Sequence, residues 1–134
     1  MMFGKTICSQ PWGGVSVGAD GVGKMCCEST AQTDKNIRTS SLSEIQRSRL
    51  FEEVRAEMLA GKKPAICWRC WQKEDHGAHS LRVSLNEWYK NTNGEFDPAR
   101  IEPQNIEFIL GNKCNLRCTM CNPGRSSGVS GLFN

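Results

Sequence analysis

Residues 12–27 have the sequence WGGVSVGADGVGKMCC and predict a β-hairpin. Val15 and Val17 alternate with smaller residues, as in a strand that has one face buried. The dipeptide Asp20-Gly21 lies between the two arms and is a strong turn signal, because glycine adopts positive φ angles without a Cβ clash. The hairpin gives the N-terminal part of the chain a small sheet around which other elements can pack.

Two helices are expected after the hairpin. Ser41 and Glu44 have the spacing of a capping box, and apolar residues then recur at nearly helical spacing as far as Leu59. Gly61 is well placed to end this helix. A second amphipathic helix is expected over residues 78–90, where apolar residues again share one face.

A linker and a strand are expected next. Two prolines, in Asp97-Pro98 and Glu102-Pro103, disfavour helix over residues 96–104. Residues 106–110 have the nearly continuous apolar sequence IEFIL, which predicts a buried strand with neighbours on both sides.

The composition indicates a soluble, cytoplasmic protein. Of the 134 residues, 38% are hydrophobic and 23% are charged, as in an ordinary globular domain. The net charge of +3 is too small to indicate nucleic-acid binding, and no apolar run is long enough to span a membrane or to form a signal peptide. In a reducing cytoplasm, eight cysteines indicate metal binding and not a disulfide framework.

Three cysteines lie close together directly after the predicted strand. Cys114, Cys118 and Cys121 have the spacing C-x3-C-x2-C. Thiolates on one loop can converge on a single metal centre, and three ligands leave one position open for chemistry.

Four other cysteines form a second group. Cys8 precedes the hairpin, Cys26 ends it, and Cys67 and Cys70 form a C-x2-C pair. Cys27 is left over and could replace Cys26 as a ligand; if Cys26 points at the metal, strand alternation turns Cys27 to the opposite face. Four thiolates close a metal site, so electron transfer or a structural role is expected here.

The loop Cys114-Asn115-Leu116-Arg117-Cys118-Thr119-Met120-Cys121, with its preceding strand, resembles the signature of the radical S-adenosylmethionine (radical SAM) enzymes. The resemblance implies a [4Fe–4S] cluster held by three cysteines, whose fourth iron binds S-adenosylmethionine. Reductive cleavage of that molecule then produces a 5′-deoxyadenosyl radical.

Residues 8–90 resemble the twitch domain, a shorter relative of the SPASM domain found in radical SAM enzymes. Pro11-Trp12, Asp20-Gly21, Cys26-Cys27 and Cys67-x2-Cys70-Trp71-x2-Glu74 carry this resemblance. It implies that Cys8, Cys26, Cys67 and Cys70 hold an auxiliary [4Fe–4S] cluster.

The expected fold is therefore α+β: a twitch-like domain over residues 1–95, a linker over 96–104, and the start of a radical SAM α/β barrel over 105–134. A barrel of this kind needs on the order of 200 residues. We therefore expect an N-terminal part of a radical SAM enzyme that is inactive alone. The implied partners are S-adenosylmethionine, a peptide or protein substrate and a separate C-terminal barrel piece, with neither membrane nor nucleic acid.

Other interpretations remain open. The same four cysteines could hold zinc in an interaction module, or a single cluster could serve a stand-alone electron carrier. A zinc site of Cys67, Cys70, His76 and His79 is also conceivable, although its spacer is short. The tryptophans Trp12, Trp68, Trp71 and Trp88 are expected in the core or around the cluster.

Overall fold

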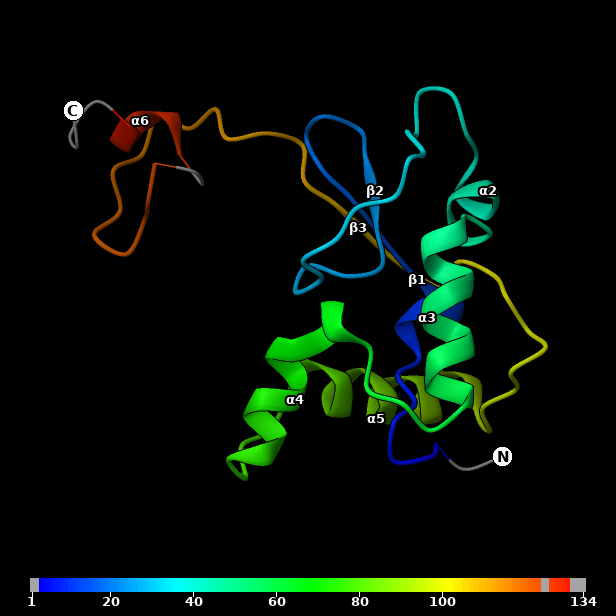
Figure 1. Ribbon diagram of the computed structural model, residues 1–134. Helices are drawn as coiled ribbons and strands as arrows, with labels where there is room; N and C mark the ends of the chain where they lie inside the picture. The colour runs from blue at the N-terminus through cyan, green and yellow to red at the C-terminus, as the bar shows by residue number, and fades with distance from the viewer. Residues whose placement is uncertain (1–2, 124–125, 131–134) are drawn as a thin grey trace.

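A three-stranded sheet and the helices around it form the α+β fold in the computed structural model, which describes residues 3–123 and 126–130 (Figure 1). The order of the strands in the sheet is β2-β1-β3. The elements in chain order are α1 (Gln10–Gly13), β1 (Gly14–Val17), β2 (Gly23–Lys24), α2 (Leu42–Gln46), α3 (Arg49–Leu59), a 3-10 turn (Ala65–Cys67), α4 (Trp68–Asp75), α5 (Leu81–Asn93), β3 (Asn105–Phe108) and α6 (Ser127–Ser130).

The predicted hairpin is confirmed. β1 and β2 pair antiparallel, with Ser16 opposite Lys24. The turn between them is closed by a hydrogen bond of 2.9 Å from the Gly21 amide to the Gly18 carbonyl. Gly21 has a φ of +85°, the conformation for which glycine was expected at this position.

The strand β3 differs from the prediction of a buried strand. It pairs in parallel with β1 and lies at the edge of the sheet. Its neighbourhood is exposed: 40% of Ile106, 53% of Phe108 and 92% of Leu110 are accessible. A continuous apolar strand needs packing layers on both faces, and the described residues do not cover β3 in this way.

The first predicted helix is present but divided. The capping box is confirmed, since the Ser41 side chain accepts from the Glu44 amide and Glu44 accepts from the Ser41 amide. α2 then ends at Gln46, and α3 begins after Ser48, whose extended backbone breaks the helix. α3 ends as predicted at Gly61, where φ is +74° and two backbone bonds close a Schellman motif.

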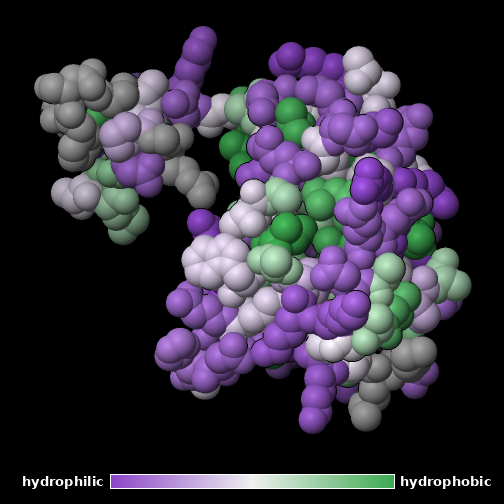
Figure 2. Space-filling model, in the orientation of Figure 1, coloured by the Kyte–Doolittle hydropathy of each residue, from purple (hydrophilic) through white to green (hydrophobic). Residues whose placement is uncertain are grey.

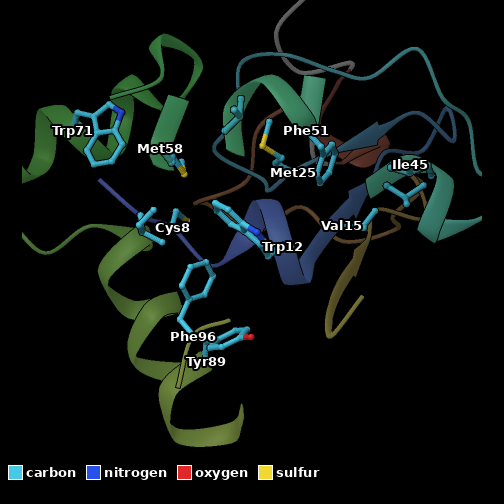
Figure 3. Close-up of a cluster of buried hydrophobic side chains, with 13 residues drawn as sticks. Cys8, Trp12, Val15, Met25, Ile45, Phe51, Met58, Trp71, Tyr89 and Phe96 are labelled. Atoms are coloured by element: carbon cyan, nitrogen blue, oxygen red, sulfur yellow. The ribbon is translucent and has the colours of Figure 1, made fainter. Parts of the chain in front are cut away.

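The core lies between α1, β1, α3 and α5 (Figure 3). Trp12, only 1% exposed, packs edge-to-face on Phe96 with ring centroids 5.0 Å apart. Phe96 belongs to the segment expected to be a linker. This segment is tied to the domain, because the Trp12 Nε1 atom donates to the Pro98 carbonyl and the Gln104 amide donates to the Gly13 carbonyl.

Buried polar contacts hold α2 and α3 onto α1. The Arg55 guanidinium donates to the carbonyls of Pro11 and Gln46 at 2.7 and 2.8 Å. Gln46 in turn donates to the carbonyl of Trp12. These bonds fix the helical layer against the segment that follows Cys8.

Hydrophilic side chains surround a hydrophobic centre on the face shown in Figure 2. Within the part of the chain that the structure describes, each helix is too short or too polar to cross a membrane. After β3 the chain leads away from the helices to a loop that ends in α6 (Figure 1). Residues 131–134, the end of the expected barrel segment, lie outside the described residues.

Candidate metal centre

Four thiols from three separate parts of the chain line one cavity. They belong to Cys8, Cys26, Cys67 and Cys70, the second group of the sequence analysis. Cys8 and Cys70 are buried, and Cys26 and Cys67 are half-buried. Met58, Leu81 and Leu85 complete the apolar part of the wall. The fold therefore brings this predicted group together.

The pair Cys67 and Cys70 lies at the beginning of α4. Cys67 is the residue before the helix, and Cys70 is in its first turn. The first amides of a helix have no intrahelical partner and carry partial positive charge. A thiolate or a cluster at this position is therefore electrostatically favoured.

Asn86 of α5 fixes the segment that carries Cys8. Its Nδ2 atom donates to the Ile7 carbonyl at 2.8 Å, and its Oδ1 atom accepts from the Ser9 amide at 2.8 Å. The side chain thus binds the backbone on both sides of the cysteine. Since these contacts are buried, they position Cys8 against the cavity without a regular element at that point.

Burial raises the pKa of three of these thiols. The pKa of Cys26 rises to about 11, although the backbone of Glu28 and Ser29 partly opposes the rise. The pKa of Cys67 rises to about 12, and that of Cys8 rises further. The other thiols of the group add to each rise, because a second negative charge in the cavity is unfavourable. Binding of a cationic metal centre would remove these protons.

As placed, the four thiols do not converge on one zinc ion. Among the described residues, no three cysteine, histidine, aspartate or glutamate side chains are placed to bind a single metal ion. Zinc with Zn–S bonds of 2.3 Å would need sulfurs only about 3.8 Å apart. In a cubane each thiolate binds a different iron, so the sulfurs surround a larger object. The donor set, four thiols lining one cavity, matches the chemistry of such a cluster.

The four-thiol cavity is small. Its volume is about 20 Å³, room for roughly one water molecule. The thiol-bearing side chains must therefore turn outward to admit a cluster. Cys26 and Cys67 are the half-buried members of the group, so part of each side chain is already exposed to solvent.

The group of three is placed differently. Cys114 and Cys118 are exposed and Cys121 is half-buried, on a stretch without helix or strand. Local contacts hold this loop, including bonds from the Cys114 amide to Ser127 and from the Cys121 amide to the Cys118 carbonyl. The structure therefore does not bring these three thiols to one metal-ion site.

The remaining candidates lie outside the four-thiol cavity. Cys27 lines a neighbouring cavity, which Cys26 also lines. The two residues lie in a bend and a turn after β2, so the alternation of side chains along a strand does not apply to them. His76 and His79 are exposed and bond to Gln72 and Ser84, so the conceived cysteine–histidine zinc site is not formed.

The tryptophan expectation is only half right. Trp12 and Trp71 are buried, but Trp68 is 47% exposed and Trp88 is 39% exposed. All eight cysteines have free thiols.

Comparison with known families identifies the N-terminal part. The model of the SPASM iron-sulfur cluster-binding domain matches residues 8–71. Residues 8–71 are therefore similar to this domain, and they are called the SPASM-like domain below. No curated protein and no solved structure matches the chain. The match to the SPASM-like domain begins at Cys8 and ends one residue after Cys70, so it spans all four thiols, and it indicates iron–sulfur cluster binding.

Two residues of the SPASM-like centre were missed by sequence reasoning. Asn86 and Arg82 both come from α5, beyond the matched residues, and both bond to the Ile7 carbonyl. The one signal for these two residues in the sequence was their position, since Arg82 and Asn86 each directly follow an apolar residue, Leu81 or Leu85, of an amphipathic helix. Such a residue is more often at a solvent-facing edge, so the pattern alone did not indicate a contact with the cysteine segment.

Proposed function

We propose that this chain is the cluster-binding part of a radical SAM enzyme. In this proposal Cys8, Cys26, Cys67 and Cys70 hold an auxiliary [4Fe–4S] cluster. Cys114, Cys118 and Cys121 hold a second cluster that binds S-adenosylmethionine at its open iron. The observation that carries the proposal is the four-thiol cavity within a SPASM-like domain, followed by the C-x3-C-x2-C loop.

The chemistry divides between the two centres. The auxiliary cluster, with four protein ligands, would transfer electrons or stabilise the domain. The chain's own residues supply a buried wall, a helix N-terminus and fixed backbone around Cys8. At the other centre the loop supplies only three thiolates, which leaves a coordination position for the amino and carboxylate groups of S-adenosylmethionine.

The exposed strand β3 supports the involvement of a barrel. Its apolar side chains are uncovered, and its outer edge has no partner among the described residues. We propose that further barrel strands, in the same polypeptide or in a separate one, pack against β3 and order the loop that follows. The substrate would be a peptide or protein bound by that barrel.

The proposal is tested by metal analysis of the anaerobically purified chain. About eight irons with matching sulfide per chain are expected, four for each cubane. Adding S-adenosylmethionine should change the electron paramagnetic resonance (EPR) spectrum of the reduced protein, and Cys118→Ala should abolish that change. Zinc without sulfide would overturn the proposal, and no effect of S-adenosylmethionine even with a barrel piece present would overturn its second half.

A second candidate is a stand-alone electron carrier that uses the four-thiol centre alone. It is favoured by the contrast between four thiols that line one cavity and a loop on which two of the three thiols are exposed. This candidate predicts about four irons per chain and a redox signal that Cys118→Ala leaves unchanged. A second set of four irons that depends on Cys118 would exclude it.

A further inference from the structure

Arg82 is the positively charged residue among the described residues that line the four-thiol cavity. Only 11% of its side chain is exposed. The other charged residue of the wall, Glu28, is negative and pairs with the guanidinium of Arg69 at 3.3 Å. A buried arginine beside four thiols calls for an explanation, because burying a cation is costly unless it is paired.

Four contacts hold the guanidinium of Arg82 in place. Its Nε and Nη2 atoms donate to the two carboxylate oxygens of Glu74 at 2.9 and 2.6 Å. Its Nη1 atom donates to the Ile7 carbonyl at 2.7 Å. The group also lies 4.8 Å from the centre of the Trp71 ring. A bidentate pair of this kind fixes both the position and the orientation of the charge.

The two charges of this pair are placed differently with respect to the cavity. Arg82 lines the cavity and Glu74 does not. The field of Arg82 at the cavity is therefore only partly cancelled by Glu74.

We propose that Arg82 raises the reduction potential of the cluster at Cys8, Cys26, Cys67 and Cys70, and that Glu74 limits this effect. Reduction adds one electron from an external one-electron donor to the oxidised cluster and so adds one negative charge. A nearby cation stabilises the reduced form more than the oxidised form. This inference rests on the proposed cluster and assigns to Arg82 an electrostatic role beyond holding the Cys8 segment.

The two partners of the pair predict shifts of opposite sign. Arg82→Met removes the cation nearest the cavity and should lower the potential. Glu74→Gln removes the compensating anion, leaves the cation in place and should raise it. A merely structural role predicts shifts of the same sign, because loss of either partner loosens α4 against α5 and admits water in the same way.

The experiment uses the full 134-residue chain carrying Cys114→Ala, Cys118→Ala and Cys121→Ala, so that one centre remains. The cluster is assembled anaerobically and titrated with dithionite while the EPR signal of the reduced cluster is followed. We expect Arg82→Met to lower the equilibrium constant for one-electron reduction of the cluster about three- to tenfold. We expect Glu74→Gln to raise this constant by a similar factor. A tenfold change corresponds to about 59 mV.

A matched pair on the surface provides the control. Arg49 and Glu53 of α3 form an exposed ion pair at 2.6 Å, with 90% and 54% of the side chains accessible. Arg49→Met and Glu53→Gln make the same charge changes away from the cavity and should leave the potential unchanged. Arg82→Lys keeps the charge and should retain most of the potential.

The possible outcomes distinguish a failure of the proposed function from a failure of the proposed role of Arg82. A parent chain that binds no cluster overturns the proposed function, and this inference with it. A cluster whose potential moves in the same direction in Arg82→Met and Glu74→Gln, or in neither, overturns the role of Arg82 alone. If Arg82→Met binds no cluster, Glu74→Gln decides by itself, because a potential that does not rise contradicts the proposal.

Discussion

The two cysteine groups of this chain differ in how far the fold prepares them for a metal centre. The group of four faces one cavity and is supported by α4, by α5 and by buried hydrogen bonds. The group of three lies on an exposed loop after an edge strand. Both groups have spacings that predict metal binding, so the spacing alone does not predict how far the packing of the fold prepares each group.

This contrast shows what a small domain can supply alone. The four thiols are placed by contacts among residues far apart in sequence, such as the bond from Ser9 to Asn86. The loop of three has contacts mostly within itself and with the α6 segment. Its metal centre would depend on ligand binding or on additional strands for its final geometry. The predictions below use this contrast.

The largest effect is expected from Cys70→Ala. This change removes a buried ligand of the proposed cluster, and since cluster binding is coupled to folding, the SPASM-like domain should lose both iron and much of its thermal stability. Iron and sulfide analysis with thermal unfolding of the anaerobic protein measures this. Cys27→Ala is the matched control and should keep both. Equal iron loss in the two variants would show that the wrong cysteine has been assigned.

Asn86→Ala should have the next largest effect. It leaves the Ser9 amide without its bond and removes one donor from the Ile7 carbonyl, which should reduce the free energy of unfolding by about 2–3 kcal/mol. Chemical denaturation of the apo-protein measures it. Asn91→Ala, at an exposed position of the same helix, should change the stability by less than about 0.5 kcal/mol. A similar loss in both variants would contradict a specific role for Asn86.

A smaller, pH-dependent effect is expected at Glu74. Burial raises its pKa, but hydrogen bonds from Arg82 and Ser80 outweigh this and lower it below the ordinary value. The resulting stabilisation is complete above about pH 4.3, the ordinary glutamate pKa, and is lost as the pH falls through the lowered value. Glu74→Gln should therefore cost about 1–2 kcal/mol at pH 7, and the difference from the parent should shrink toward pH 3.

Urea denaturation of the apo-protein at several pH values measures the Glu74 effect. Glu53→Gln, in the exposed pair on α3, is its control and should show almost no such dependence. A cost for Glu74→Gln that grows as the pH falls would contradict the sign of the pKa shift.

The smallest effect on stability is expected from Cys118→Ala. Its side chain is exposed and the loop around it contributes little to the core, so the free energy of unfolding should change by less than about 0.5 kcal/mol. The iron content should nevertheless fall from about eight to about four per chain if the second cluster forms. A stability loss as large as that of Cys70→Ala would mean that the loop is part of the folded domain.

Local signals predicted the local structure well. The turn at Asp20-Gly21, the capping box at Ser41 and the end of α3 at Gly61 each depend on a few adjacent residues, and each is confirmed. The break between α2 and α3 was missed because the apolar spacing continues across it. The extended backbone of Ser48 interrupts the helix there and puts this residue at the N-cap position of α3. Nothing in the sequence alone indicated the break.

The sequence pattern did not predict which strands pair with one another. The sequence of β3 predicts a strand, but nothing in it specifies β1 as its neighbour or leaves its side chains exposed. The grouping of Cys8 with Cys26, Cys67 and Cys70 was predicted from spacing and resemblance, and the structure places them on one cavity. The supporting residues Asn86 and Arg82 could not be predicted, since their partners are backbone or distant side chains.

The parallel pairing of β3 with β1 also limits how far the C-x3-C-x2-C loop can travel. Cys114 lies six positions after Phe108, the last residue of β3, and an extended chain advances at most about 3.6 Å per residue. Cys114 therefore remains within about 22 Å of the sheet whatever shape the loop adopts. The pairing of β3 with β1 thus restricts the volume that the loop can occupy. This restriction raises the effective concentration of the three loop thiols near the SPASM-like domain.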